Sequence, residues 1–341
     1  MLSASLAVAG IEIGFRAAGY YRCSLASAFP PLYASDPALN HVHLQDVAVR
    51  HCSYYGDYDV IYHTDTRGHR TTTLPAVDGR PAVLLLGDSY TFGFGVADQQ
   101  TFAARLQALR PDVRVINLGV SSYTIDQETA VLRDARRWVG AIDRIVLQVT
   151  PANDFSELAS HRDSPRGIED LATHVDDTGR LVKSARYVPV YKQWLRHSYL
   201  YRFVTEGRGR FGVQPDQDES DEDSDWAVGW GADVIETRSR QWMSDHEREV
   251  RDYFAAAEAF FDAAAPHPII VVLLPARFMP TPGLNPFLHR RLLEFFAQHR
   301  ATVLDVDSGL TRGDYLPRDP HFSARGHRRI AEQLSRALQE R

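Results

Sequence analysis

The stretch Val83-Leu84-Leu85-Leu86-Gly87-Asp88-Ser89-Tyr90 joins a short apolar run to a glycine and a serine. Four consecutive apolar residues before a glycine are typical of a buried parallel strand that ends in a tight turn. Open α/β sheets carry their reactive groups at the carboxyl ends of such strands, so Ser89 stands where a nucleophile would be presented. The competing interpretation is an ordinary strand-to-helix turn in which the serine caps the helix.

Further apolar runs follow along the chain and alternate with segments of helical periodicity. The predicted strands are Val83–Leu86, Val113–Leu118, Arg144–Thr150, Ile269–Leu274 and Thr302–Val306. The predicted helices are Gln99–Leu109, Asp126–Val139, Val190–Val204, Glu247–Ala264, Phe287–His299 and Ser323–Leu338. Alternating strands and helices favour right-handed crossovers between parallel strands. The sequence therefore predicts an α/β fold, a three-layer α/β/α domain with a five-stranded parallel sheet.

Residues 1 to 80 lie outside this alternation and form a predicted N-terminal extension to a main domain at 81–341. The extension begins with an apolar helical segment, turns at Pro30–Pro31 and contains a possible β segment around Asp57–Tyr62. Within the main domain, residues from about 206 to 235 are rich in Gly, Asp and Glu. That composition is typical of an acidic, flexible surface insertion.

The charge of the chain is concentrated in that insertion. The 341 residues include 38 Lys and Arg against 44 Asp and Glu, and seven of the acidic residues lie between Asp216 and Asp225. Without those seven the chain is nearly neutral, which gives no support for nucleic-acid binding. With 44% hydrophobic and 24% charged residues, the composition excludes a wholly disordered, collagen-like or polytopic membrane protein.

Neither the N-terminal segment nor the two cysteines identify the cellular compartment of the protein. Cys23 and Cys52 have no metal-ligand spacing and could form a disulfide or remain two free thiols. The apolar start contains Glu12, is too short to span a bilayer and lacks the features of a signal peptide. This apolar start fits two interpretations: an amphipathic helix packed on the domain, or the remnant of a membrane anchor. The cell envelope or another extracytoplasmic location is favoured over the cytoplasm.

A second reactive group lies near the other end of the chain, in Arg318-Asp319-Pro320-His321. A serine hydroxyl is a weak nucleophile that needs a general base, and the base needs a third group to orient it. His321 and Asp319 could supply these two functions, although a loop histidine that only bonds locally is the competing interpretation. His327 lies within the predicted last helix, a position that favours packing.

Two further segments could stabilise a developing oxyanion. Gly119 ends the second strand, where its backbone N–H can approach a ligand, and Asn153 follows the third strand with an amide that can donate. We expect these groups to converge with Ser89 and His321 on one rim of the sheet. The sequence has neither a dinucleotide fingerprint nor a Walker A lysine, and no cofactor or metal is expected. The histidines outside the rim have irregular spacings: His41, His43, His51, His63 and His69.

Taken in order, Gly87-Asp88-Ser89, Gly119, Asn153-Asp154 and Asp319/His321 resemble the four sequence blocks of the SGNH/GDSL hydrolase superfamily. The resemblance covers residues 81–339, and the lead-in Thr64–Arg70 resembles a segment that often precedes the first block in bacterial members. It implies a flavodoxin-like α/β/α fold and serine ester hydrolysis or acyl transfer without a metal.

The resemblance also implies a role for each block. Ser89 would be the nucleophile, His321 the base and Asp319 its orienting acid. The Ser89 N–H, the Gly119 N–H and the Asn153 side chain would form the oxyanion hole.

Two positions depart from the family pattern. Pro151 stands where the family usually has a glycine, which could alter how Asn153 is presented. The usual acid precedes the histidine by three residues, but Arg318 occupies that position. Asp319, two residues before, matches the spacing of branches that resemble sugar O-acetyltransferases. Asp314 is the fallback acid.

We therefore expect an esterase or O-acyltransferase that forms an acyl-enzyme on Ser89. Its substrates would be small acyl esters, acetyl foremost, of a carbohydrate or cell-envelope glycan. A lipid or lysophospholipid esterase is one alternative, supported by the apolar start and by the aromatic residues of the predicted helix Val190–Val204. A non-catalytic binding protein on the same fold is another. The expected partner is an ester substrate and not a nucleic acid, with peripheral or N-terminal membrane association left open.

Overall fold

The structure is a computed structural model of residues 1–341. It describes 2–17, 31–53, 57–72, 79–151, 153–162, 173–175, 179–183, 198, 200–201, 232–274, 285–306, 310–317 and 319–339. The acidic run Asp216–Asp225 and most of the predicted helix Val190–Val204 lie outside these residues.

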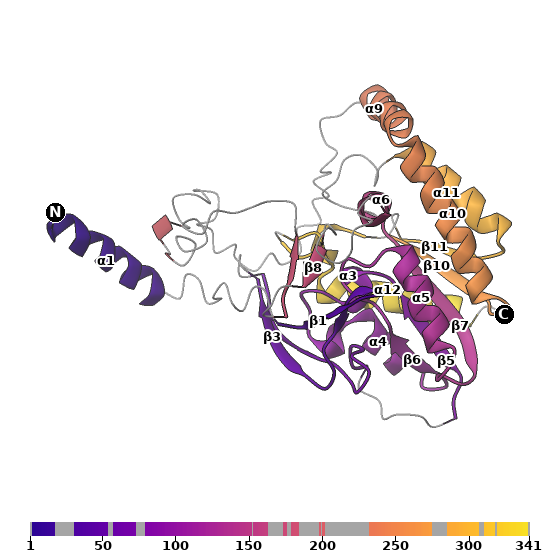
Figure 1. Ribbon diagram of the computed structural model, residues 1–341, viewed down its shortest axis with the longest axis horizontal. Helices are drawn as coiled ribbons and strands as arrows, with labels where there is room; N and C mark the ends of the chain where they lie inside the picture. Colours follow the sequence, from indigo (N-terminus) through magenta and orange to yellow (C-terminus); the bar gives the residue numbers. More distant parts are fainter. Residues whose placement is uncertain are drawn as a thin grey trace.

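A five-stranded parallel sheet forms the centre of the molecule (Figure 1). Its strands are β5 (Ala82–Leu86), β6 (Arg114–Asn117), β7 (Ile142–Val149), β10 (Ile269–Leu273) and β11 (Thr302–Asp305). They run in the order β11-β10-β7-β5-β6, and each neighbouring pair is parallel. The predicted α/β fold with a five-stranded parallel sheet is confirmed, and the reactive loops gather at the carboxyl ends of these strands.

Helices cover both faces of the sheet because the side chains of each strand alternate between them. On one face, Leu84 and Leu86 of β5 pack with α5 (Ile125–Ala135), α6 (Asp154–Arg162), α10 (Glu247–Ala264) and α11 (Pro286–Gln298). On the other face, Val83 and Leu85 pack with α4 (Phe102–Leu109) and α12 (Ala324–Ala337). The strand is therefore buried on both sides, as its continuous apolar sequence predicts.

The helices begin where the sequence supplies caps. Thr101 accepts a hydrogen bond from Ala104 N at the start of α4, and Asn285 accepts from Leu288 N at the start of α11, followed by Pro286. Helix α10 has Glu247 and Glu249 in its first turn and buries Val250, Tyr253, Ala257 and Phe260 along one stripe. These local signals explain why the predicted helices lie close to the observed ones.

The N-terminal part of the chain contains more strand than the sequence indicates. It holds α1 (Leu2–Ala17), the hairpin β1 (Tyr33–Asp36) and β2 (Asn40–His43), and the hairpin β3 (Ala48–Cys52) and β4 (Asp59–His63). The predicted β segment corresponds to β4. The other three strands are short and rich in polar side chains, so they lack the apolar alternation that marks a strand.

Other elements outside the prediction are α6, the small hairpin β8 (Thr173–Val175) and β9 (Leu181–Lys183), and α9 (Ala232–Asp245). Helix α9 includes the last four residues of the stretch predicted as an acidic insertion. The described elements also include the short helix α3 (Ser89–Phe92) and two single-turn 3-10 helices, η1 (Asp98–Gln100) and η5 (Arg312–Asp314).

The segment after β4 lies along the edge of the main sheet. Arg70 forms an isolated antiparallel bridge with Asn117 of β6, and the Thr72 hydroxyl donates to the Val115 carbonyl at 3.0 Å. The segment thereby covers the edge strand, which would otherwise offer unpaired backbone groups. The hairpins pack against Phe92 and the loop after β6, while the predicted domain boundary at residue 80 stays a prediction.

Cys52 is buried and disulfide-bonded, and the other cysteine of the sequence, Cys23, lies outside the described residues. Within the part of the chain that the structure describes, no helix is both long enough and apolar enough to cross a membrane.

Candidate active site

The turn after β5 presents Ser89. Gly87 has a φ of +152°, and a Cβ there would lie 2.3 Å from Thr91 Oγ1 and 2.4 Å from Gln148 Oε1, so only glycine fits. Asp88 caps the short helix α3 (Ser89–Phe92) by accepting a hydrogen bond from Tyr90 N at 2.9 Å. Because Asp88 and not Ser89 is the cap, the serine hydroxyl is left to other partners.

His321 joins this hydroxyl to Asp319. Its Nε2 lies 2.7 Å from Ser89 Oγ and its Nδ1 lies 2.5 Å from Asp319 Oδ1. A carboxylate can only accept, so Nδ1 carries the proton and Nε2 is the acceptor for the serine O–H. Ser89 and His321 are 232 residues apart in the chain, and the sheet brings them within hydrogen-bond distance.

The surroundings of Asp319 favour its ionised form, which can accept the hydrogen bond from His321 Nδ1. Burial would raise the pKa of Asp319, but its hydrogen bonds with His321 and the charge of that ring outweigh burial, and the pKa lies below its ordinary value. The carboxyl also accepts from the His321 backbone N–H at 2.9 Å. Asp319 can therefore remain ionised and orient the ring at neutral pH.

The fallback acid Asp314 has other partners. It is fully buried and contacts Arg325 Nε at 3.1 Å and Arg329 Nη1 at 2.9 Å, and it accepts from Thr311 N at 2.7 Å. These bonds tie η5 to the last helix. The structure thus brings Asp319 to His321 and leaves Asp314 in the packing of the C-terminal segment.

Two aromatic rings contact the imidazole of His321. The centroid of the Tyr90 ring lies 4.7 Å away, and that of Phe94 lies 4.4 Å away. His51 of β3 packs against Phe94 with its centroid at 4.7 Å.

His327 lies elsewhere, buried in α12, where its Nδ1 accepts from Phe102 N at 3.2 Å and burial lowers its pKa to about 3. It is a packing residue, as its position in the sequence predicts.

The expected oxyanion donors also lie against the serine turn. A Cβ on Gly119 would lie 2.5 Å from Phe92 N, so the glycine lets α3 approach the loop after β6. The Gly119 N–H itself donates to Asn117 Oδ1 at 3.0 Å. Asn153 donates from Nδ2 to Asp88 Oδ2 at 2.9 Å and to Glu157 Oε2 at 3.4 Å, and the first of these bonds ties the loop after β7 to Asp88.

Gln148 of β7 is a supporting residue that the sequence reasoning missed. Its Oε1 accepts from Asp88 N at 3.1 Å and from Thr91 Oγ1 at 3.0 Å, and its Nε2 donates to Thr150 Oγ1 at 2.7 Å. One buried amide therefore connects the loops that carry Ser89 and Asn153. The signal available in the sequence is that Gln148 is the one polar residue in the buried second half of the strand, Ile145–Val149.

Buried carboxyl groups lie behind these loops. Burial raises the pKa of Glu128 well above its ordinary value, and the negative charges of Asp88 and Glu157 add to the effect. Burial likewise raises the pKa of Asp154, with Asp88 and Glu128 contributing, and the pKa of Asp88 is raised despite its bonds from Asn153 and Tyr90. The described residues contain no His, Cys, Asp and Glu group arranged to hold a metal ion.

No protein-family model and no curated protein sequence matches this chain. Solved structures do match this chain. A carbohydrate acetylesterase from Sinorhizobium meliloti matches over 76% of this chain and 99% of its own, with 11% identity and a TM-score of 0.43.

Two other solved structures have similar coverage. A member of the lipolytic G-D-S-L family from Veillonella parvula covers 76% of this chain and 99% of its own, at 12% identity and a TM-score of 0.42. A psychrotrophic esterase from Pseudoalteromonas covers 76% and 97%, at 11% identity and a TM-score of 0.39. These likenesses concern the fold, and the chemistry of the site rests on its own geometry.

The two aspartates should differ in what their loss affects. Asp319→Asn should lower kcat for p-nitrophenyl acetate by about 10²- to 10⁴-fold with little change in Tm, because the ring loses its orienting anion. Asp314→Asn should lower Tm and keep most of the kcat, because it weakens contacts with Arg325 and Arg329. The assignment is wrong if Asp314→Asn abolishes turnover at unchanged Tm while Asp319→Asn stays active.

Replacing Glu128 should change how stability depends on pH. A carboxyl whose pKa is raised by folding contributes stability below its unfolded pKa of about 4.5 and loses it as pH rises through the folded pKa. The stability of Glu128→Gln relative to wild type should therefore increase between about pH 5 and about pH 8. Calorimetric Tm values at both pH values measure this, with Glu294→Gln on the exposed side of α11 as control. Parallel curves for Glu128→Gln and wild type would contradict the assignment.

Proposed function

We propose that this protein is a serine-dependent esterase or O-acyltransferase that works through an acyl-enzyme on Ser89. The observation that carries the proposal is the continuous hydrogen-bonded line from Ser89 Oγ through His321 to Asp319, with distances of 2.7 and 2.5 Å. Nucleophile, base and orienting acid within hydrogen-bond reach of one another are what covalent acyl transfer requires.

In the first step Ser89 Oγ attacks the ester carbonyl while its proton passes to His321 Nε2. The bond from Oγ to the carbonyl carbon forms, and the former carbonyl oxygen becomes an oxyanion. His321 then gives its proton to the departing alcohol as the ester bond breaks. Asp319 stabilises the imidazolium between these two transfers.

The proposed donors to the oxyanion are the Ser89 N–H, the Asn153 amide and the Gly119 N–H. Among the described residues, none accepts a hydrogen bond from Ser89 N–H, which lies at the first position of α3. Asn153 donates one amide hydrogen to Asp88 Oδ2 at 2.9 Å and the other to Glu157 Oε2 at 3.4 Å, and it would take part by turning the longer of these bonds to the oxyanion. Gly119 would take part by sharing the N–H that now bonds to Asn117.

The acyl-enzyme is then attacked by water or by a sugar hydroxyl, with His321 taking the proton of the attacking group and returning it to Ser89. Hydrolysis and transfer use the same residues. We propose a small acyl group, acetyl foremost, on a carbohydrate or cell-envelope glycan. The support for this class is the Asp319-Pro320-His321 spacing, which resembles that of sugar O-acetyltransferase branches.

The nucleophile can be tested without a known substrate. A fluorophosphonate probe should label the wild-type protein and fail to label Ser89→Ala, because the probe needs an activated serine oxygen. His321→Gln should label more slowly by about 10²-fold or more, because the base is lost. Equal labelling of wild type and Ser89→Ala, or no labelling of wild type, refutes the catalytic proposal and leaves a binding protein on this fold.

The acyl group can be tested with a series of p-nitrophenyl esters. We expect kcat/KM to be highest for acetate and to fall by about tenfold or more for octanoate, and a glycan acceptor to divert acetyl from water if the protein is a transferase. The measurements are p-nitrophenol release and acetyl incorporation into the glycan. A rise in kcat/KM with chain length would instead support a lipid esterase.

A further inference from the structure

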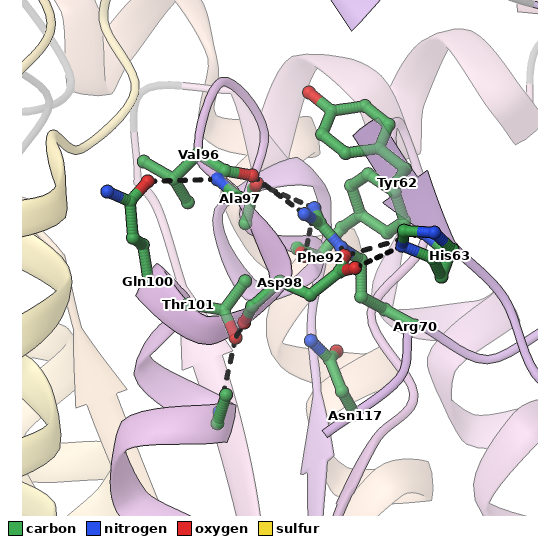
Figure 2. Close-up of polar contacts among 12 residues, drawn as sticks. Tyr62, His63, Arg70, Phe92, Val96, Ala97, Asp98, Gln100, Thr101 and Asn117 are labelled. Atoms are coloured by element: carbon green, nitrogen blue, oxygen red, sulfur yellow. Dashed lines mark hydrogen bonds and ion pairs between the residues drawn. The ribbon is translucent and has the colours of Figure 1, made fainter. Parts of the chain in front are cut away.

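Arg70 is a fully buried arginine that lies just after β4 and reaches into the loop that follows the catalytic serine helix (Figure 2). Its Nη1 donates to the carbonyls of Gly93 and Phe92 at 2.8 and 3.2 Å, and its Nη2 donates to that of Val96 at 2.7 Å. Its Nε donates to Asp98 Oδ1 at 2.7 Å. All three guanidinium nitrogens therefore hold the segment from residue 92 to 98.

The buried charge is well compensated. The guanidinium lies over the rings of Tyr62 and Phe92, at 4.1 and 4.7 Å from their centroids, and its counter-ion Asp98 also bonds to His63 Nδ1 at 2.6 Å. Burial lowers the pKa of Arg70, whereas Tyr62 and Asp98 raise it, and an arginine keeps its charge under these conditions. The desolvation of both ions is thus offset by the ion pair with Asp98, by three bonds to backbone carbonyls and by the two aromatic contacts.

The β3–β4 hairpin adds a fourth backbone contact to the same loop. The hydroxyl of Tyr62 accepts from Gly95 N at 2.8 Å and lies 2.6 Å from His51 Nδ1. Arg70 and Tyr62 together bond to the backbone of four of the five residues from Phe92 to Val96. The remaining residue of the five is Phe94.

Phe94 connects this loop to the catalytic histidine. Its half-buried ring lies between His51 and His321, with centroids 4.7 and 4.4 Å away, and is tilted by 31° from the His321 ring. Tyr90 also contacts the imidazole, with its ring centroid 4.7 Å away. A shift of the Phe94 backbone would therefore remove one of the two aromatic contacts that limit rotation of the base.

We propose that Arg70 is a positioning residue for His321. It fixes the backbone on both sides of Phe94, and Phe94 keeps the imidazole in the orientation that joins Asp319 Oδ1 to Ser89 Oγ. The guanidinium suits this task because its planar fork donates in several directions at once, whereas a lysine ammonium is a point charge on a flexible stem. The inference rests on the proposed function, in which His321 is the base.

The test compares Arg70→Met, Arg70→Lys and Phe94→Leu with Arg114→Met as the matched control. Arg114 also donates to backbone carbonyls, those of Arg80 at 3.0 Å and Val139 at 2.6 Å, but at the opposite end of the sheet. For p-nitrophenyl acetate we expect kcat to fall by about ten- to hundredfold in the first three variants, with KM within about twofold of wild type. Arg114→Met should keep the wild-type kcat.

A second readout does not need turnover. The proton that His321 Nδ1 donates to Asp319 should give a downfield proton NMR signal, assigned by its absence in His321→Gln. The signal should be present in wild type and Arg114→Met and be broadened or lost in Arg70→Met and Phe94→Leu. If the protein lacks esterase activity and Ser89 does not label, the proposed function fails, and this signal still decides the positioning role.

The proposal is overturned if Phe94→Leu keeps both the wild-type kcat and the NMR signal. It is also overturned if Arg114→Met loses as much kcat as Arg70→Met does. Should Arg70→Met fail to fold, Phe94→Leu decides, because that variant leaves every hydrogen bond of the guanidinium in place.

Discussion

The hydrogen bond between His321 Nε2 and Ser89 Oγ sets a demanding condition on the fold, because its two residues lie 232 positions apart. Strand β5 carries the serine to the rim of the sheet, and the last helix α12 follows the histidine on the face that it shares with α4. An error of about 1 Å in either position would separate the two groups beyond productive contact. Many of the buried hydrogen bonds near the rim fix the positions of the loops that carry these two residues.

Three loops meet at this rim, and buried side chains connect them directly. Gln148 bonds to the turn of Ser89 and to Thr150, and Asn153 returns a bond to Asp88. Asn117 adds a bond from its Nδ2 to the Thr91 carbonyl while accepting from Gly119. Gln148 and Asn117 each donate and accept, and Asn153 bonds across to the loop of Asp88. The loops therefore constrain one another.

The strands of the sheet and five of the helices, α4, α5, α10, α11 and α12, could be predicted because their signals are local. The apolar run Val83–Leu86 and the stripe of Val250, Tyr253 and Phe260 appear in any reading of the sequence. Ser89, Asp319 and His321 could be named because each stands beside a recognisable turn or helix start. The contacts of Arg70 had no comparable signal. Asp98 and the carbonyls that Arg70 contacts are distant from it in the sequence, and every residue has a backbone carbonyl, so the sequence does not mark which ones will accept. The polar strands β1 to β3 were missed because their stability comes from packing against the serine loop and not from their own periodicity.

The hairpins β1–β2 and β3–β4 have a consequence for how the catalytic unit is delimited. A boundary drawn from the sequence blocks alone would begin at residue 81 and would retain Ser89, His321 and Asp319. Such a trimmed protein would lack the guanidinium of Arg70 and the hydroxyl of Tyr62, and it would leave three carbonyls and one N–H of the loop from 92 to 96 without their partners. The smallest part of the chain with a complete rim is therefore larger than the part that carries the reacting groups.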